Sequence, residues 1–205
     1  MLNQENRNGN TFNGNAFVDI TFLKDFKFTF NVGTTVNEIR YYTTTNPYYG
    51  FGAEQNGTVT MYHYRTTTLN LQQILNYSHN FGKHNISVML GHESYKYNYA
   101  ELSASKKNMF SYWGNHELNG AVIDGSSAAS YSNDYNTEGY FFRALYDYDA
   151  KYYFSASYRR DASSRFHPDH WWGNFYSVGG AYLMSKEDWF DVKWIDMLKI
   201  KFSIG

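Results

Sequence analysis

The sequence predicts an all-β fold, an antiparallel meander of about eight strands. Polar and apolar residues alternate repeatedly with a period of two, which is the pattern of a strand whose two faces differ. No stretch of useful length shows the period of a helix. Short and long connections alternate between the predicted strands, which is typical of a meander that has a tight end and a long-loop end.

The predicted strands run through most of the chain. The clearest one spans 26–33, where every second residue is Phe or Val. The last one, 198–204, alternates Leu, Ile and Phe with Lys and Ser. Two further alternating stretches, 140–148 and 152–159, are separated by two residues, which predicts a tight hairpin. Weaker patterns predict the remaining strands at 16–22, 58–79, 85–99 and 172–183.

The predicted connections differ in length at the two ends of the meander. The short ones are 23–25, 80–83 and 149–150, and the long ones are 39–57, 100–137 and 162–171. The seventh connection, 184–193, departs from this rule and contains one predicted helical turn at 185–190. Short turns at one end and long loops at the other are typical of bacterial outer-membrane barrels.

The two faces of the predicted strands also favour a membrane barrel. One face is dominated by Phe and Tyr, whereas the core of a soluble sandwich shares that face with branched aliphatics. The other face is small and polar, which suits a wet or plugged lumen. We expect lipid to contact Phe28, Phe30, Phe142, Phe154, Ile200 and Phe202. We expect the lumen to contact Thr29, Asn31, Ser155, Ser157 and Lys199.

Composition argues against several other classes of protein. Aromatic residues make up 20% of the 205 residues and charged residues 18%, which excludes intrinsic disorder. Eighteen basic and 19 acidic residues give a net charge of -1, so nucleic acid is not expected as a partner. The chain has no Cys, and therefore no disulfide framework or cysteine nucleophile. It also has no apolar run near the roughly 18 residues that a membrane-spanning helix needs.

An ordered series of short motifs resembles one family of outer-membrane proteins. Upstream it comprises ILNY at 74–77, FGKHN at 81–85 and GHE at 91–93. Downstream it comprises GYFFRALYDYDAKYYFSASYRRDASSRF from Gly139, WGNFYSVGGAY from Trp172, SKEDWF from Ser185 and LKIKFSIG from Leu198. In this order and spacing they resemble the SusC/RagA type of TonB-dependent outer-membrane transporters. The chain departs from the family pattern at Ala162, Tyr176, Lys201 and Ile204, where Gly, Pro, Arg and Tyr are usual.

The resemblance implies that residues 1–205 are a fragment of the β-barrel domain of a TonB-dependent receptor, a barrel of 22 strands. We expect no plug domain and no signal peptide, since the polar start MLNQENRNGN lacks the pattern of a secretory signal. The implied protein lies among the lipids of the bacterial outer membrane and imports a glycan or a peptide. Its implied partners are TonB and a SusD-like surface lipoprotein, contacted through regions absent here. No cofactor is implied.

Two other interpretations of the strand pattern stay open. Eight strands can close around a filled interior, so the chain fits a complete small outer-membrane barrel that serves as an anchor or adhesin. Aromatic loops would also suit a soluble, secreted β-sandwich that binds carbohydrate.

Aromatic residues in the predicted connections are the best candidates for binding a ligand or partner. Flat rings stack on sugars and anchor protein interfaces. The alternative is that they pack the loops against one another. The candidates are Tyr41, Tyr42, Tyr48, Tyr49, Phe51, Trp113, Trp171 and Trp172.

Charges gather where the strand at 152–159 ends. They predict a structural network at the barrel rim, and the alternative is a clamp in which guanidinium groups bind a carboxylate of the substrate. The residues are Arg159, Arg160, Asp161 and Arg165.

The sequence predicts neither an enzyme nor a metal site. Glu187 and Asp188 are adjacent in one turn, whereas hydrolytic acid/base chemistry needs two carboxylates on opposite sides of a substrate. No Ser lies in a G-x-S-x-G elbow. His167, Asp169 and His170 share one loop, but a metal needs three or four converging ligands, so we expect solvated side chains there.

Overall fold

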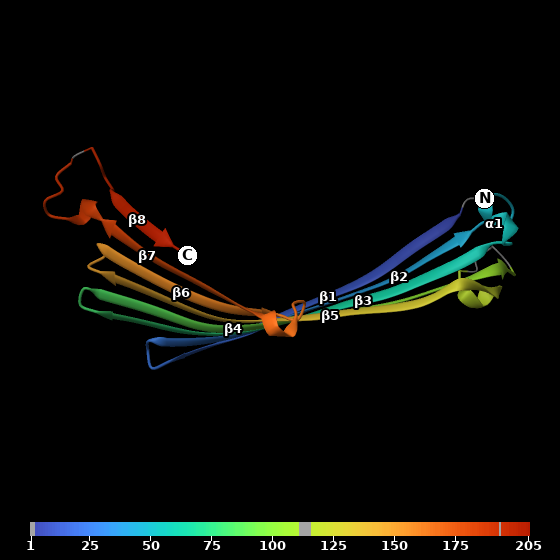
Figure 1. Cartoon of the computed structure of the whole chain (residues 1–205), viewed down its shortest axis with the longest axis horizontal. Helices are drawn as coiled ribbons and strands as arrows, with labels where there is room; N and C mark the ends of the chain where they lie inside the picture. The colour runs from blue at the N-terminus through green and yellow to red at the C-terminus, as the bar shows by residue number, and fades with distance from the viewer. Residues whose placement is uncertain (1–2, 111–115, 193) are drawn as a thin grey trace. The chain divides into compact units, whose positions relative to one another are not determined.

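The structure is a computed structural model that describes residues 3–110, 116–192 and 194–205. It confirms a sheet of eight strands that pair in chain order (Figure 1). The pairs from β5 to β8 are antiparallel and in continuous register. The strands are β1 Gln4–Phe22, β2 Phe26–Thr45, β3 Thr58–Phe81, β4 His84–Met109, β5 Ala121–Tyr148, β6 Tyr152–Ser163, β7 Trp172–Leu183 and β8 Lys199–Ile204.

The sheet is single and open. Its order begins at β1 and ends at β8, and no described residues pair these two strands with each other. A complete eight-stranded barrel would need that pairing, and a sandwich would need a second sheet. The open sheet therefore contradicts both alternatives left by the strand pattern.

Four strands, β1, β2, β4 and β5, are much longer than predicted. The predicted loop 100–137 is therefore wrong over most of its length, and the predicted loop 39–57 is wrong over its first part, 39–45. β2 continues to Thr45 and β4 to Met109, while β5 begins at Ala121. Most residues in these extensions are polar, and the tyrosines and few aliphatic residues among them do not alternate regularly with the polar ones. Backbone hydrogen bonds to the neighbouring strands hold the extensions, and these bonds do not depend on side-chain polarity. The same reason explains why β1 begins at Gln4 and not at Ala16.

The short connections behave as predicted. Asp149 and Ala150 form the turn of the β5–β6 hairpin with φ of 54° and 50°, the two positive values of a type I′ turn.

The helical turn predicted at 185–190 is a shorter 3₁₀ turn, η3 (Met184–Lys186), and Ser185 does not cap it. Another short 3₁₀ turn, η2 (Pro168–His170), lies between β6 and β7.

Contacts divide the chain into two compact units. Unit 1 comprises residues 1–14, 34–69 and 97–134, and unit 2 comprises 15–33, 70–96 and 135–205. Strands β1 to β5 contribute to both units, whereas β6, β7 and β8 belong to unit 2 alone. No helix in the described part of the chain is long and apolar enough to cross a membrane.

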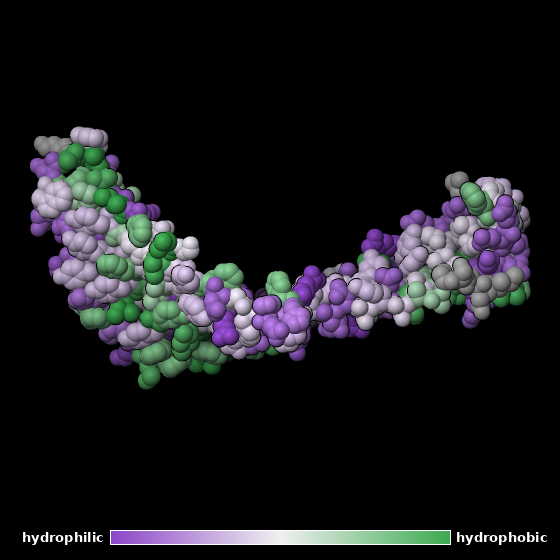
Figure 2. Space-filling model, viewed as in Figure 1, coloured by the Kyte–Doolittle hydropathy of each residue, from purple (hydrophilic) through white to green (hydrophobic). Residues whose placement is uncertain are grey.

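Unit 2 has an aromatic face and a polar face, as the alternation predicts. Phe28, Leu75, Leu90 and Phe142 lie together around one shallow hollow of the aromatic face. Hydrophobic residues gather over the strands of unit 2 in Figure 2. Large side chains on this face are solvent-exposed in the isolated chain, with Phe202 at 68%. An apolar surface of this kind is uncommon on a soluble monomer.

An aromatic row crosses the aromatic face near the short turns. Each ring lies 4.8 to 6.4 Å from the next, measured between centroids. The row runs across seven strands, from β1 to β7, and resembles the girdle that marks a membrane interface. Its members are Phe22, Phe26, Tyr77, His79, Phe81, His84, Tyr148, Tyr152 and Tyr182.

Unit 1 contains a small core beneath its connections. Val59, Met109 and Ala121 are buried together, and Met61 and Leu118 pack against them. The connection between β2 and β3 includes the short helix α1 (Phe51–Glu54), and the one between β4 and β5 includes η1 (Leu118–Gly120). This core attaches the connections of unit 1 to the strand ends.

Gly91 of β4 gives a test of close packing in the wall. Phe141 of β5 lies directly over it, and an added Cβ would overlap the ring. We expect Gly91→Ala to lower the free energy of unfolding by about 1–3 kcal/mol, because the ring must move. Gly180 is the matched control, since its nearest neighbour would be 3.8 Å from an added Cβ. Urea titration of Gly91→Ala and Gly180→Ala should separate them, and equal midpoints would contradict the packing.

Candidate functional site

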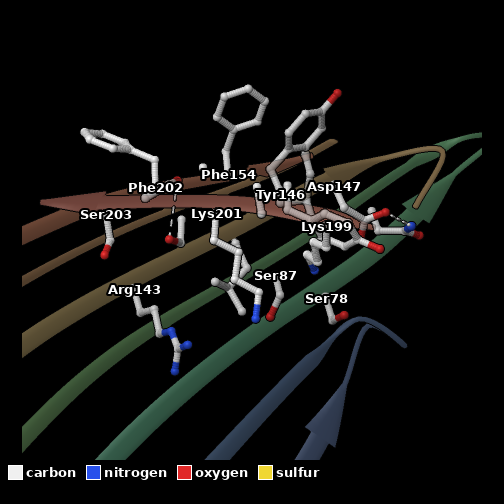
Figure 3. Close-up of a pocket in the computed structure, with 18 of the residues that line it drawn as sticks. Ser78, Ser87, Arg143, Tyr146, Asp147, Phe154, Lys199, Lys201, Phe202 and Ser203 are labelled. Atoms are coloured by element: carbon white, nitrogen blue, oxygen red, sulfur yellow. Dashed lines mark hydrogen bonds between the residues drawn. The ribbon is translucent and has the colours of Figure 1, made fainter. Parts of the chain in front are cut away.

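A groove of about 680 Å³ lies on the polar face of unit 2. Figure 3 shows Arg143, Lys201 and Ser203 on one side of the strands and the rings of Phe154 and Phe202 on the other. The alternation predicted at β5, β6 and β8 is therefore confirmed. Hydroxyl, amide and cationic groups line the groove beside apolar side chains such as Leu145, so this face can accept water and polar or anionic groups.

The charges of this groove are only partly paired among the described residues. Lys199 lies 3.8 Å from the ring centroid of Tyr153, a cation–π contact. Asp147 accepts a hydrogen bond from the side-chain amide of Asn85 at 2.8 Å. Lys199 lies among the polar residues that line the groove, as the prediction for the lumen side requires. Which face contacts lipid stays a prediction.

The four predicted rim charges do not form one network. Arg159 donates to Asp161 at 2.7 Å and also to Glu93 of β4, on the polar face. Arg160 lies on the opposite face, 4.7 Å from the centroid of Trp172. Arg165 follows β6 and lies 4.0 Å from the centroid of Tyr135. Strand alternation separates Arg159 from Arg160, because successive side chains point to opposite faces.

A second groove of about 630 Å³ lies beside Arg159 in unit 2. The indole N–H of Trp171 donates to the backbone oxygen of Phe166 at 2.7 Å, which fixes one wall of the groove. Trp172 begins β7 and also lines it, together with Phe175. Two of the predicted aromatic candidates thus border a groove, and their role in binding stays a prediction.

The other aromatic candidates lie in different environments. Tyr41 and Tyr42 belong to β2 and not to a loop. Tyr42 stacks on His116 at 4.5 Å. Tyr48 and Tyr49 lie in the connection after β2, and Phe51 begins α1 with 95% of its surface exposed. Trp113 lies outside the residues that the structure describes.

Strand tyrosines form a site that the loop-based prediction missed. Tyr41 of β2 contacts Tyr62 of β3 at 5.7 Å, and Tyr64 contacts Tyr99 of β4 at 6.1 Å, between centroids. These four rings, with Glu5, Arg7 and Glu101, line a groove of about 360 Å³ within unit 1. Tyrosines at alternate positions, such as 62 and 64, were the available signal. We call this set the tyrosine groove.

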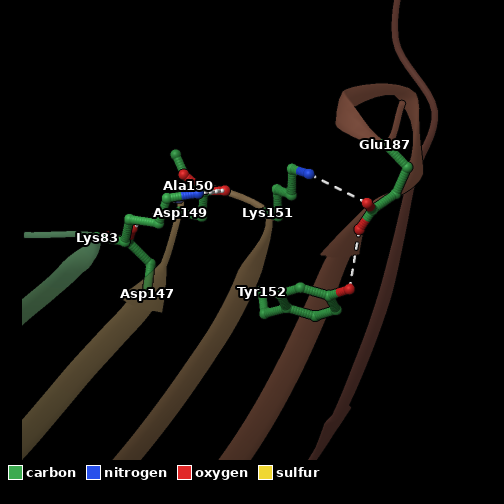
Figure 4. Close-up of polar contacts among 7 residues, drawn as sticks. All are labelled: Lys83, Asp147, Asp149, Ala150, Lys151, Tyr152 and Glu187. Atoms are coloured by element: carbon green, nitrogen blue, oxygen red, sulfur yellow. Dashed lines mark hydrogen bonds and ion pairs between the residues drawn. The ribbon is translucent and has the colours of Figure 1, made fainter.

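Ion pairs join neighbouring connections of unit 2 (Figure 4). Lys83 contacts Asp149 at 2.9 Å, and Lys151 contacts Glu187 at 3.0 Å. The hydrogen bond from Lys83 lowers the pKa of Asp149, and hydrogen bonds from Tyr152 and Lys151 lower that of Glu187. A carboxyl group whose pKa is lowered in the folded state stabilises the fold. This stabilisation is fully present above the ordinary pKa of the carboxyl and is lost as the pH falls through its folded pKa.

The Lys83–Asp149 contact should be measurable by titration. We expect Lys83→Met to raise the pKa of Asp149 toward its ordinary value of 3.8, because the largest stabilising interaction with its carboxylate is removed. Carboxyl chemical shifts followed from pH 6 to about pH 2 would report the change, since that range covers ordinary carboxyl titration. Lys24→Met in another short turn is the control, and an unchanged Asp149 titration in Lys83→Met would contradict the assignment.

The histidine loop after β6 offers no metal geometry. His167 Nδ1 and Asp169 Oδ2 are 3.4 Å apart, and both side chains are at least 71% exposed. Within the described ranges, no three His, Cys, Asp or Glu side chains are grouped to hold a metal ion.

Known proteins resemble the chain along nearly its whole length. No family model matches it. TonB-dependent receptor P3 of Formosa agariphila is 29% identical over 191 residues, which cover 90% of this chain and 18% of that protein. TonB-dependent receptor SusC of Bacteroides thetaiotaomicron is 26% identical over 213 residues, which cover 100% of this chain and 20% of that protein. The chain is similar, over its whole length, to a segment of the SusC/RagA-type TonB-dependent receptors.

The fold of this receptor segment agrees with its sequence relatives. The RagAB peptide importer in its closed-closed state superposes with a TM-score of 0.89 at 23% identity, covering 98% of this chain and 23% of that one. The segment spans about a fifth of the length of the curated relatives above. Its sheet matches part of the RagA barrel. TonB-dependent receptors are outer-membrane proteins, which confirms the predicted location.

Proposed function

We propose that residues 1–205 form a wall segment in the barrel domain of an outer-membrane transporter that imports a large nutrient, a glycan or a peptide. Transport is energised by TonB, and a SusD-like surface lipoprotein acts with the barrel. The segment is structural and ligand-contacting, and it carries no catalytic chemistry. The observation that carries this proposal is the sheet with an aromatic and a polar face, in a chain related to TonB-dependent receptors.

Strand length supports unit 2 as the membrane-spanning part. A tilted membrane strand needs about 9–11 residues. β6 and β7 have 12 residues each, whereas β4 and β5 have 26 and 28. β4 and β5 are more than twice as long as a strand needs to be to cross the membrane. In unit 1, the face of these strands that is aromatic in unit 2 carries mostly polar residues. We therefore assign the aromatic face of unit 2 to lipid and unit 1 to the aqueous phase.

The polar face supports a hydrated passage. Asn31 donates to Gln72 at 3.1 Å, and the hydroxyls of Ser157 and Ser177 are 2.8 Å apart. Such groups tolerate water and would be costly in contact with hydrocarbon. Arg159, bound to Glu93 and Asp161, bridges β4 and β6 across this face. It is better placed to fix the wall than to clamp a substrate, because two carboxylates already occupy its guanidinium group.

Uptake by cells tests the function. Deleting the gene that encodes the receptor should abolish growth on one class of polymer, and a plasmid copy should restore it. A complementing copy whose TonB-contacting segment is removed should assemble but fail to restore growth. Growth on every nutrient without the receptor, or restoration without TonB contact, would contradict energised import.

A further inference from the structure

Four tyrosines of β2, β3 and β4 lie on the opposite face from the aromatic row of the same strands. They are Tyr41, Tyr62, Tyr64 and Tyr99. In unit 2, Asn31 of β2 pairs with Gln72 of β3 on the polar face. Ten residues along each strand, Tyr41 pairs with Tyr62. An even number of residues preserves the side of a strand, so both tyrosines occupy the positions that are polar in unit 2.

The next strand pair follows the same rule. Tyr95 of β4 contacts Tyr135 of β5 at 5.8 Å, and four residues further along each strand Tyr99 contacts Tyr131 at 6.1 Å. The equal spacing shows one register without a bulge. On this mostly polar face, tyrosine rings thus begin with Tyr95 and Tyr135, at the ends of their unit 2 segments, and continue with Tyr99 and Tyr131 in unit 1. Core packing does not explain them, since Tyr62 is 37% and Tyr131 is 60% exposed.

The rings of the tyrosine groove are held but not covered by each other. The Tyr41–Tyr62 and Tyr64–Tyr99 pairs are tilted by 40° and 37°, and a tilted pair leaves ring surface open. The guanidinium of Arg7 donates to the Tyr64 hydroxyl, and the Tyr99 hydroxyl donates to Glu101. These contacts fix the ring orientations before a ligand arrives, which reduces the entropy lost on binding.

The charges of the tyrosine groove select among ligands. The two carboxylates of Glu5 and Glu101 and the guanidinium group of Arg7 give the groove a net charge of -1. Arg7 already donates a hydrogen bond to the hydroxyl of Tyr64. An anionic ligand would be repelled. Carboxylate oxygens accept hydrogen bonds from hydroxyl groups, and aromatic faces pack on the C–H surfaces of sugar rings. The groove volume of about 360 Å³ lies within the usual range of small-ligand sites.

An extended peptide fits this groove less well. Peptides that bind sheets usually add a strand through main-chain hydrogen bonds. The tyrosine groove lies over the face of the sheet, where neighbouring strands already pair in the order β1 to β4. Recognition there depends on side chains alone. Building on the proposed transport function, we infer that the tyrosine groove is a binding site for a neutral oligosaccharide, with Tyr62 and Tyr99 as stacking residues.

The test uses the 205-residue chain in detergent micelles on an array of neutral oligosaccharides, acidic oligosaccharides and peptides. We expect retention on neutral oligosaccharides. Tyr62→Ala and Tyr99→Ala should each weaken it roughly five- to tenfold, the effect of one lost ring contact. Tyr62→Phe should keep most of the binding because the ring remains. His63→Ala is the matched control on the other face of β3, and circular dichroism verifies that each variant keeps its sheet.

The outcomes separate this inference from the proposed function. No retention on any neutral oligosaccharide, a preference for acidic ligands or peptides, or equal binding by the Ala variants would each overturn the tyrosine groove as a sugar site. Assembly of the barrel in lipid tests the proposed function without any ligand. A receptor that assembles and imports its nutrient while its groove binds no neutral sugar would refute only the further inference.

Discussion

Phe28→Arg should impair assembly of the complete receptor far more than Thr29→Arg. Phe28 lies on the aromatic face of unit 2, beside Leu75, Leu90 and Phe142. An Arg at a lipid-facing site near the middle of the membrane costs about 2–4 kcal/mol. Thr29 is its neighbour on the same strand and donates to Asp19 at 2.6 Å on the polar face. An Arg there meets water and a carboxylate, so the cost should be small.

Heat modifiability on gels and urea titration in lipid vesicles measure the difference. The fraction of folded receptor should fall steeply for Phe28→Arg and little for Thr29→Arg. Phe142→Arg and Arg143→Ala on β5 repeat the comparison on a second strand whose faces are known from the β5–β6 register. Equal losses for the two faces would refute the assignment of lipid and lumen.

The 205-residue chain alone should aggregate in plain buffer and become monodisperse in detergent. Among the described residues, no strand pairs with the outer edges of β1 and β8, and such edges pair with other chains. Phe154, Val178 and Phe202 are each more than half exposed on the aromatic face. Burial of this surface by detergent is worth roughly 25 cal/mol per Å² of apolar area, so we expect detergent to raise the soluble fraction strongly.

A matched pair of triple variants locates the cause of aggregation. Replacing Phe154, Val178 and Phe202 by Ser should raise the soluble fraction in buffer. Replacing Ser155, Ser177 and Ser203, their neighbours on the polar face, by Ala should leave it unchanged. Sedimentation velocity measures both variants. A monodisperse parent chain in buffer with a cooperative melt would contradict the assignment of the aromatic face to lipid.

Much of the strand order could be predicted from local patterns. Alternation at 26–33, 140–148 and 152–159 predicted strands that the structure confirms, because one face of unit 2 is aromatic and the other polar. Alternating residues mark a strand wherever its two faces meet different surroundings. The Asp149–Ala150 turn was readable for the same reason, since two clear strands bounded it.

The extensions of β2, β4 and β5 were not predictable from hydropathy. In unit 1 polar and tyrosine side chains predominate and the few aliphatic residues are scattered, so the period of two vanishes although the ladder continues. The missed tyrosine groove has the same cause. The sequence pattern predicts Tyr41 in a loop and Tyr62, Tyr64 and Tyr99 in strands, whereas only the register brings the four together in one groove.

The sequence by itself determined the class of fold, the order of the strands and the family, because alternation and motif order are local properties of the chain. Only the tertiary structure decided which side chains meet. It separated Arg160 from Arg159, paired Arg159 with Glu93 across 66 residues, and joined Lys151 to Glu187 between turns. The physical reason is register: the position at which two strands pair fixes every cross-strand contact, and no local pattern in either strand encodes it fully.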